Sequence, residues 1–494
     1  MTQPGSVVVL FNRDLRLHDH PALAEAIHAA AAVLPLFVLD DEILATVKRA
    51  PNRIAFLLRS LADLDASLRA IGGRLVVRRG DVVAEAIQAA RVARARAIFA
   101  SADVSACAQR REQRLESACG ASGIQWRRFP GVTVVPPGEL RPQDGDHFRV
   151  FTPYWRRWSA ASLRSVVPAP RRIVLPSGFG RRADPLPHLD ALAHGMPSPD
   201  LPQGGETAGR ARLASWSRGR LARYAELHDA VAADGTSRLS PYLHFGCLSP
   251  LEITLRLGRH PLAEPFLRQL CWRDFFAQVM HAFPAYSQED YRPGGHGWRD
   301  DGEALERWKA GRTGYPLVDA GMRQLRREGW MHNRARLVTA SFLVKDLRVD
   351  WRLGAAHFLD WLVDGDVASN SGNWQWVAGT GNDPRPGRMF NPTRQGERFD
   401  PGGDYVRRYV PELAALAGRR VHQPWLLERA DRRRLDYPPP IVDHAQAALA
   451  FRDERSRQRR SALPAAAKPV LTSACLPSGA PRARRRQGRG RPIH

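Results

Sequence analysis

Short apolar runs alternate with longer amphipathic segments over the first 130 residues of the chain. The apolar runs predict five strands, at Val7–Phe11, Leu34–Leu39, Leu75–Val77, Ala97–Ala100 and Ile124–Trp126. The segments between them have helical periodicity, as in Asn52–Ala70 and Asp81–Ala93. Because strands that alternate with helices favour parallel pairing, residues 1–130 predict a doubly wound α/β domain with a parallel five-stranded sheet.

The pattern changes twice after residue 130. Residues 131–205 are rich in Pro, Gly and Arg and show little periodicity, which predicts a long linker between domains. Residues 206–450 have helical periodicity and start signals such as Ser249-Pro250, a polar cap before a proline. The predicted fold class is therefore α/β plus all-α. Residues 451–494 are basic and of low complexity, and we expect this tail to be disordered.

Composition narrows the class of protein further. Hydrophobic residues make up 44% and charged residues 25% of the 494, so the chain as a whole is not disordered. It has no apolar run of the ~18 residues that a membrane helix requires, and its first residues do not resemble a secretion signal. We expect a soluble cytoplasmic protein. The five cysteines are widely spread and form no CxxC motif, so we expect neither a disulfide framework nor a metal site.

The chain carries a formal charge of +24, with 74 basic and 50 acidic residues. A guanidinium-rich surface favours a polyanionic partner such as nucleic acid, because it binds phosphate and displaces counterions. The alternative is coding bias in a chain rich in Ala and Arg. The tail supplies part of the excess, but the remaining residues are still strongly basic.

One predicted helix, Glu264–Phe283, carries a mixed polar and aromatic face. Gln269, Trp272, Arg273 and Phe276 are spaced i, i+3, i+4 and i+7, which places them on one side. This face is typical of a binding surface, and the alternative is a solvated edge with one aromatic residue. The first strand is not followed by GxGxxG, so a cofactor site is expected elsewhere than in the α/β domain.

Three further segments combine groups that suit a polar heterocycle with phosphates. Arg336 and Asp364 could form an ion pair beside a ligand, or an ordinary surface pair of little energetic value. Residues 370–376 supply two indoles and three side-chain amides for contact with a flat ring. Residues 236–240 offer hydroxyl and backbone N–H groups for phosphate, although such runs also serve as simple helix caps.

Together these segments resemble the DNA photolyase/cryptochrome family. The resemblance is carried by LFNRDLRLHDHPAL (10–23), GTSRLSPYLHFGCLSP (235–250), RQLCWRDFF (268–276), TGYPLVDAGMRQL (313–325), WMHNRARLVTASFLVKDLRVDWR (330–352), DGDVASNSGNWQWVAGTG (364–381) and FNPTRQGERFD (390–400). It runs from about residue 6 to about residue 445 and is strongest to bacterial photolyases that repair cyclobutane pyrimidine dimers. It implies an α/β antenna domain, a linker and a helical FAD-binding domain.

The resemblance also implies roles for individual residues. Binding of FAD is implied for Tyr224, Thr236, Ser237, Arg238, Leu239, Ser240, Phe266, Arg336, Asp364, Gly365, Asp366 and Asn370. Contact with the lesion or its DNA is implied for Gln269, Trp272, Arg273, Phe276, Asn333, Arg334, Leu337, Trp376 and Gln395. Electron transfer between the surface and the flavin is implied for Trp374, Trp351 and Trp298.

The chain departs from the family pattern beside the lesion, with Gln269 in place of the usual Glu and Leu337 in place of Met. His228 stands where an Arg often contacts DNA, and Asn333 disfavours repair of (6-4) photoproducts. The resemblance implies a monomer that acts on UV-damaged DNA, with a second antenna chromophore of the 8-hydroxy-5-deazaflavin type rather than methenyltetrahydrofolate. The alternatives are a cryptochrome-like photoreceptor with little or no repair, and a basic DNA-binding protein without a cofactor.

Overall fold

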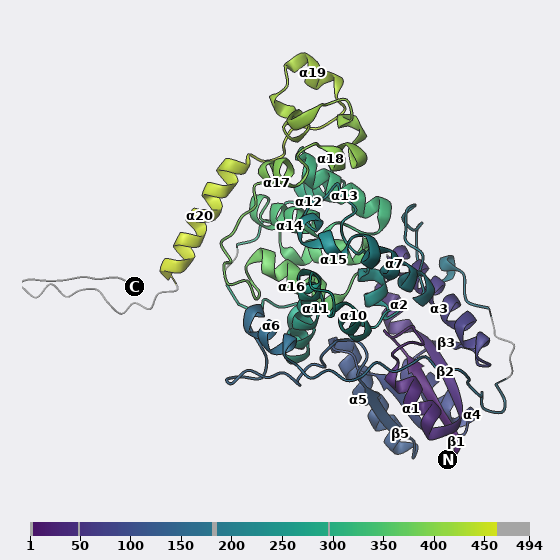
Figure 1. Cartoon of the computed structure of the whole chain (residues 1–494). Helices are drawn as coiled ribbons and strands as arrows, with labels where there is room; N and C mark the ends of the chain where they lie inside the picture. Colours follow the sequence, from purple (N-terminus) through teal and green to yellow (C-terminus); the bar gives the residue numbers. More distant parts are fainter. Residues whose placement is uncertain (1–2, 48–49, 180–184, 295–296, 462–494) are drawn as a thin grey trace, which may run out of the picture.

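The computed structural model describes residues 3–47, 50–179, 185–294 and 297–461 (Figure 1). Its sheet has five parallel strands in the order β3-β2-β1-β4-β5, which confirms the predicted doubly wound domain. The strands are β1 (Gln3–Phe11), β2 (Ala30–Asp40), β3 (Val76–Gly80), β4 (Ala95–Ser101) and β5 (Gln125–Phe129). The central strand β1 pairs Val7 with Val33 of β2 and with Ala97 of β4.

Side chains of β1 alternate between two hydrophobic cores, as expected for a sheet covered on both faces. Val7, Val9 and Phe11 join the core that α1 (Pro21–Ala29) and α3 (Pro51–Ala70) share. Val8 and Leu10 pack against α4 (Val82–Val92) and α5 (Ala106–Ala121). The first core continues into the helical domain. A short helix, α2 (Asp41–Val47), follows β2.

The segment predicted as a linker contains a helix that the sequence reading did not anticipate, α6 (Phe151–Ser159). Its buried residues Phe151, Tyr154 and Trp158 pack against α11 (Glu264–Ala282). The Trp158 indole also donates to the Asp274 carboxylate of α11 at 3.0 Å. A helix of nine residues that is stabilised by tertiary contacts shows little helical periodicity in its sequence. Because its flanks are also rich in proline, the sequence did not predict it. The segment also contains the short turn η1 (Leu189–Ala191).

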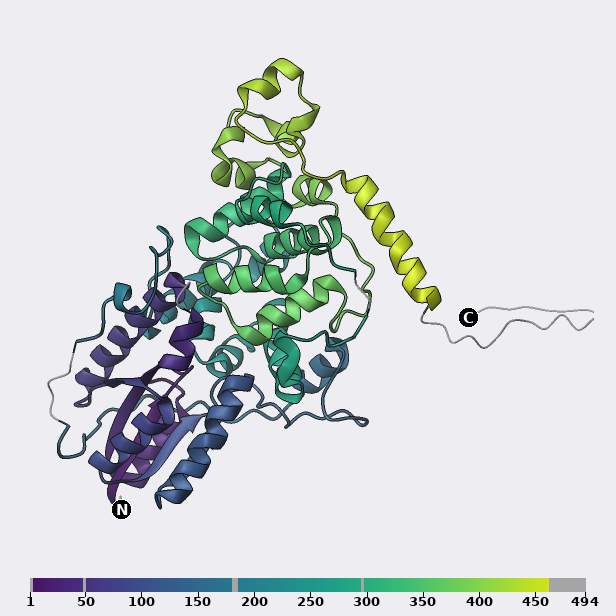
Figure 2. The ribbon, with the colours of Figure 1, turned by 180° about the vertical axis from the view of Figure 1, so that it is seen from behind.

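From residue 206 onward the described chain is helical, and its helices gather on one side of the α/β domain, with α19 (Arg429–Arg434) at the far end and α20 (His444–Ser461) projecting from the body (Figures 1 and 2). The α-helices besides α11, α19 and α20 are α7 (Glu206–Gly219), α8 (Tyr224–Leu227), α9 (Ser240–His244), α10 (Pro250–Leu257), α12 (Gly302–Lys309), α13 (Pro316–Glu328), α14 (Asn333–Ser341), α15 (Trp351–Trp361), α16 (Val367–Ala378), α17 (Pro392–Phe399) and α18 (Asp404–Tyr409). Shorter turns are η2 (Leu221–Arg223), η3 (Pro284–Ser287), the π-helical η4 (Phe342–Asp346), η5 (Pro411–Leu413), η6 (Gly418–His422) and η7 (Pro424–Leu426). Ser249 caps α10 as expected, since its hydroxyl accepts the Glu252 N–H at 3.1 Å.

The last helix, α20, runs past residue 450, where the disordered tail was predicted to begin. Residues 451–461 are therefore helical, because they are rich in Arg and also contain Glu and Gln, which are good helix formers. The helix lies beside η4, where Arg348 pairs with Glu454 and Lys345 lies 5.6 Å from the Phe451 ring. The remaining tail, 462–494, is outside the described residues. Within the part of the chain that is described, no helix is long and apolar enough to cross a membrane.

Candidate functional site

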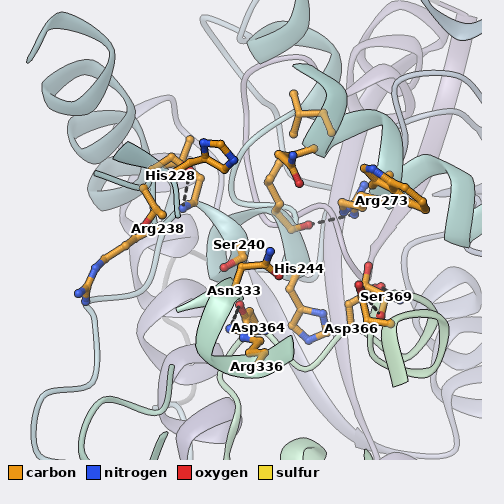
Figure 3. Close-up of a pocket in the computed structure, with 18 of the residues that line it drawn as sticks. His228, Arg238, Ser240, His244, Arg273, Asn333, Arg336, Asp364, Asp366 and Ser369 are labelled. Atoms are coloured by element: carbon orange, nitrogen blue, oxygen red, sulfur yellow. Dashed lines mark hydrogen bonds and ion pairs between the residues drawn. The ribbon is translucent and has the colours of Figure 1, made fainter. Parts of the chain in front are cut away.

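A cavity of about 400 Å³ lies in the helical domain (Figure 3). Its wall is built from the 236–240 turn, α11, the start of α14, the 364–366 loop and α16. From the predicted cofactor set, the cavity gathers Tyr224, Thr236, Ser237, Arg238, Leu239, Ser240, Phe266, Arg336, Asp364 and Asp366. From the predicted lesion set, it gathers Gln269, Trp272, Arg273, Phe276, Asn333, Leu337 and Trp376.

A smaller cavity of about 80 Å³ adjoins the first and shares wall residues such as Arg336 and Leu337 with it. It brings in Gly365, Asn370 and Trp374. The Asn370 side chain is buried and donates to the Ala355 carbonyl at 3.1 Å, which fixes its orientation. These three predicted residues therefore lie beside the main cavity rather than on its wall.

Arg334 and Gln395, two predicted contacts of the lesion or its DNA, do not line either cavity. The Arg334 guanidinium is held by the Asp229 carboxylate at 2.7 Å and lies 4.3 Å from the Phe399 ring of α17. Gln395 is half-buried on α17, and its Oε1 has no hydrogen-bond partner among the described residues. Charge and sequence position alone did not reveal that Arg334 has a partner within the protein.

The predicted face of α11 forms one side of the cavity, which we call the aromatic wall: Gln269, Trp272, Phe276 and, from α16, Trp376. The Trp272 ring stacks on Phe151 of α6 with centroids 3.7 Å apart and planes 3° apart. Helices α11 and α16 cross closely at Gly372, where an added Cβ would lie 2.1 Å from the Phe276 ring. Only glycine permits this approach, so Gly372 sets the position of α16 against α11.

Other residues of the lining carry charge, and we call Arg238, Arg336, Asp364 and Asp366 the ion-paired wall. As predicted, Arg336 pairs with Asp364, with Nη2 2.8 Å and 3.1 Å from the two carboxylate oxygens. Arg336 Nε also donates to the Met331 carbonyl at 2.8 Å. The Asp364 side chain is only 2% exposed, so this pair is not the surface alternative considered from the sequence.

Arg238 adopts a left-handed backbone conformation, with φ of 53°. A residue with a Cβ rarely does so unless its surroundings hold it. The Arg238 guanidinium binds Glu328 at 2.8 Å and Asp234 at 3.0 Å, and it lies 4.4 Å from the Trp330 ring. These partners fix the Arg238 side chain, and the other residues of the 236–240 turn add hydroxyl and backbone groups to the cavity wall.

Several wall residues were not singled out from the sequence, among them His244, Trp330, Met331 and Ser369. They lie within quoted motifs, but nothing in the sequence marked their side chains as facing a cavity. The main omission is Arg13, which follows β1 in the α/β domain and pairs with Asp366. A contact between residues 353 positions apart gives no local signal.

Burial and neighbouring charges set the ionisation of this region. Burial alone would raise the pKa of Asp366, but the guanidinium groups of Arg13 and Arg273 outweigh it and hold that pKa well below its usual range. Burial holds the pKa of His244 far below its ordinary value, and Arg13 adds to the effect. The cavity therefore contains an ionised carboxylate beside a neutral imidazole.

The three predicted electron-transfer tryptophans lie outside the main cavity and differ in exposure. Trp374 lines the smaller cavity and is 2% exposed, and an added Cβ at Gly354 of α15 would lie 2.2 Å from its ring. Trp351 begins α15, is fully buried, and donates from its indole to Asp290 at 2.9 Å. Trp298 is half-buried and lines a small hollow with Phe451 of α20.

Two family models match this chain, "DNA photolyase" over residues 7–172 and "FAD binding domain of DNA photolyase" over residues 266–457. They identify the class as a two-domain flavoprotein. The deoxyribodipyrimidine photo-lyase of Streptomyces griseus is 52% identical over 458 residues, which cover 91% of this chain and 98% of that protein. The chain belongs to the DNA photolyase family.

Solved structures agree in fold over nearly the whole length. A class III photolyase from Agrobacterium tumefaciens has a TM-score of 0.86 at 33% identity, covering 93% of this chain and 99% of that one. A cryptochrome from Synechocystis has a TM-score of 0.83 at 34% identity, covering 92% of this chain and 99% of that one. The fold is therefore common to photolyases and cryptochromes.

The residues of the cavity fit FAD. The cofactor presents a flat ring with polar edges, a hydroxylated chain and a diphosphate. The cavity offers apolar side chains such as Leu270, hydroxyl groups in the 236–240 turn and the paired guanidinium of Arg336. The buried Nδ1 of His244 has no hydrogen-bond partner in the described structure, so a polar ligand atom would satisfy it.

Proposed function

We propose that this protein repairs cyclobutane pyrimidine dimers in DNA by light-driven electron transfer from reduced FAD. The observation that carries the proposal is a single cavity whose lining includes both the ion-paired wall and the aromatic wall. The first suits a tightly held charged cofactor, and the second suits an extruded pair of bases. Both ligands would then lie in one site, within reach of a direct electron transfer.

In this proposal the ion-paired wall and the 236–240 turn hold the cofactor. The Arg336–Asp364 pair presents a fixed guanidinium edge, and Asn370 is oriented by the Ala355 carbonyl. When bound and reduced, FAD supplies under blue light the electron that splits the dimer. The protein supplies orientation and exclusion of water, and no side chain is required to act as an acid or a base.

The aromatic wall receives the dimer. Base flipping is the general solution for enzymes that act on a base within a duplex, photolyases among them. Trp272 and Trp376 are half-buried indoles that can stack on the flipped bases, each stacking contact being worth ~1–3 kcal/mol. The amides of Gln269 and Asn333 make no side-chain hydrogen bonds within the described residues, so their donors and acceptors can serve the pyrimidine edges.

We further propose that Trp298, Trp351 and Trp374 carry electrons from the surface to the flavin, which is supported by the half-buried position of Trp298 and the burial of Trp351 and Trp374. We propose a second chromophore of the 8-hydroxy-5-deazaflavin type, since residues 101–112 lack the Asn-Glu pair of folate-binding relatives. The protein would act as a monomer in the cytoplasm.

The test uses an oligonucleotide with one thymine cyclobutane dimer, incubated with chemically reduced holoprotein under blue light and in darkness. A matched (6-4) substrate sets the specificity. Light-dependent restoration of the cyclobutane dimer alone supports the proposal. No repair by a protein that retains fully reduced flavin would contradict the proposal and favour the photoreceptor alternative. That alternative is supported by the similarity in fold to the Synechocystis cryptochrome and by the departures Gln269 and Leu337.

A further inference from the structure

Arg13 extends from the α/β domain into the contact between the two domains, behind the ion-paired wall. Its guanidinium binds two carboxylates, Asp103 at 3.1 Å in its own domain and Asp366 in the helical domain. Its Nε donates to the His244 carbonyl at 3.1 Å. Of the two acids, Asp103 is 6% exposed and Asp366 is 10% exposed, so both charges depend on this partner.

Asp366 connects Arg13 with the cavity in two ways. It lines both cavities directly. It also caps α16, because its Oδ1 accepts the Ser369 N–H at 2.8 Å. Helix α16 carries Asn370, Trp374 and Trp376, so the residue that fixes Asp366 also fixes the start of this helix.

The two guanidinium groups near Asp366 differ in how closely they approach its carboxylate. Arg13 makes a direct ion pair with Asp366, whereas the Arg273 guanidinium donates to the Val132 and Leu243 carbonyls instead. Loss of Arg13 would leave a buried carboxylate with only distant compensation. It would then rotate away from its position or take up a proton, and either change would alter the potential at the cavity wall.

We propose that Arg13 is a positioning residue of the cofactor site, through which the α/β domain fixes the charge and place of Asp366 beside the flavin. The proposal rests on the proposed FAD site. It assigns the α/β domain a part in tuning the cofactor, in addition to its implied role as an antenna domain.

The test compares R13Q with R164A in the purified full-length holoprotein. Arg164 is the matched control, because it pairs with Asp19 of the α/β domain at 2.9 Å yet lines neither cavity. We measure the rate of FAD release, the visible absorption bands of the bound flavin and the midpoint potential. R13Q should release FAD at least about tenfold faster, with shifted bands and potential. R164A should lower the melting temperature but leave the bands and potential as in wild type.

R13K should restore the bands and potential in part, since it returns the positive charge without the second donor. If R13Q does not fold, D366N replaces it, because Asn keeps the helix cap but removes the charge that Arg13 holds. The same shift is expected for D366N. Bands and potential unchanged in folded R13Q, or in D366N where R13Q does not fold, would overturn the proposal. A wild-type protein that binds no FAD would instead overturn the proposed function.

Discussion

The two walls of the main cavity are built differently. On the ion-paired wall, Arg336 and Asp364 hold each other, and Arg238 is held by Asp234 and Glu328. On the aromatic wall, the Trp272 ring rests flat on Phe151, and the Gln269 amide forms no hydrogen bond with the described residues. A wall that is fixed before its ligand arrives suits a resident cofactor. A flat wall with unused polar groups suits a substrate that enters and leaves.

The largest effect should come from breaking the ion-paired wall. R336A leaves Asp364 buried without its partner, a change that costs about 3–5 kcal/mol. We expect purified R336A to be almost free of FAD and therefore colourless. The control is R323A, which breaks the Arg323–Glu412 pair at 2.7 Å away from both cavities. A normal FAD-to-protein ratio in R336A would show that this pair does not hold the cofactor.

Breaking the aromatic wall should spare the cofactor. W376A removes one stacking surface, so affinity for dimer-containing DNA should fall by a factor of about 5–150, corresponding to ~1–3 kcal/mol. The FAD content should match wild type. W425A, which changes another half-buried indole outside both cavities, serves as control. Equal loss of affinity for undamaged DNA in W376A would argue against a lesion-specific wall.

A third variant distinguishes the light-driven reduction of the flavin from the repair that the reduced flavin carries out. W351F replaces a fully buried indole outside the cavity, so light-driven reduction of oxidised flavin should slow at least about tenfold. Repair by chemically reduced W351F should equal wild type. W361F, on the same helix but half-buried, should behave as wild type in both assays. Normal photoreduction in W351F would exclude this residue from the electron path.

Acid should lower the stability of the fold through His332, which precedes α14. Burial lowers the pKa of His332 to about 4 from its ordinary 6.5, so between these values the unfolded state binds more protons than the folded state. Stability is therefore lost as the pH falls from about 6.5 to about 4, by roughly 3 kcal/mol. H332N keeps a helix cap without titrating, so its urea-unfolding free energy should change less over this range. Parallel pH curves for the two proteins would contradict this account.

The smallest effect should come from Gln269 of the aromatic wall, where a change to Glu replaces the amide nitrogen by an oxygen. Q269E introduces the carboxyl group that the family resemblance implies at this position, and a hydrogen bond to a charged group exceeds a neutral one by ~1 kcal/mol. We expect repair to accelerate by a factor of about 5 under saturating light. Q269A should be slower than wild type. A Q269E enzyme no faster than wild type would show that the amide serves equally well.

The sequence predicted those features that leave a local pattern. The strands followed from apolar runs, and the shared face of Gln269, Trp272, Arg273 and Phe276 followed from helical spacing. The Arg336–Asp364 ion pair was predicted from the opposite charges of the two side chains together with the resemblance of their motifs to the family. Features that depend on tertiary packing were not predicted. These are helix α6 in the linker, the ion pair of Arg334 with Asp229, and the ion pair of Arg13 with Asp366.

The central claim is that cofactor and lesion occupy one cavity, and flavin fluorescence tests it directly. The holoprotein is titrated with an oligonucleotide that contains one cyclobutane dimer, and separately with the undamaged oligonucleotide. The account predicts a change in flavin emission that saturates at one damaged strand per protein, is absent with undamaged DNA and is weakened in W376A. Tight binding of damaged DNA with unaltered flavin emission would contradict the shared cavity.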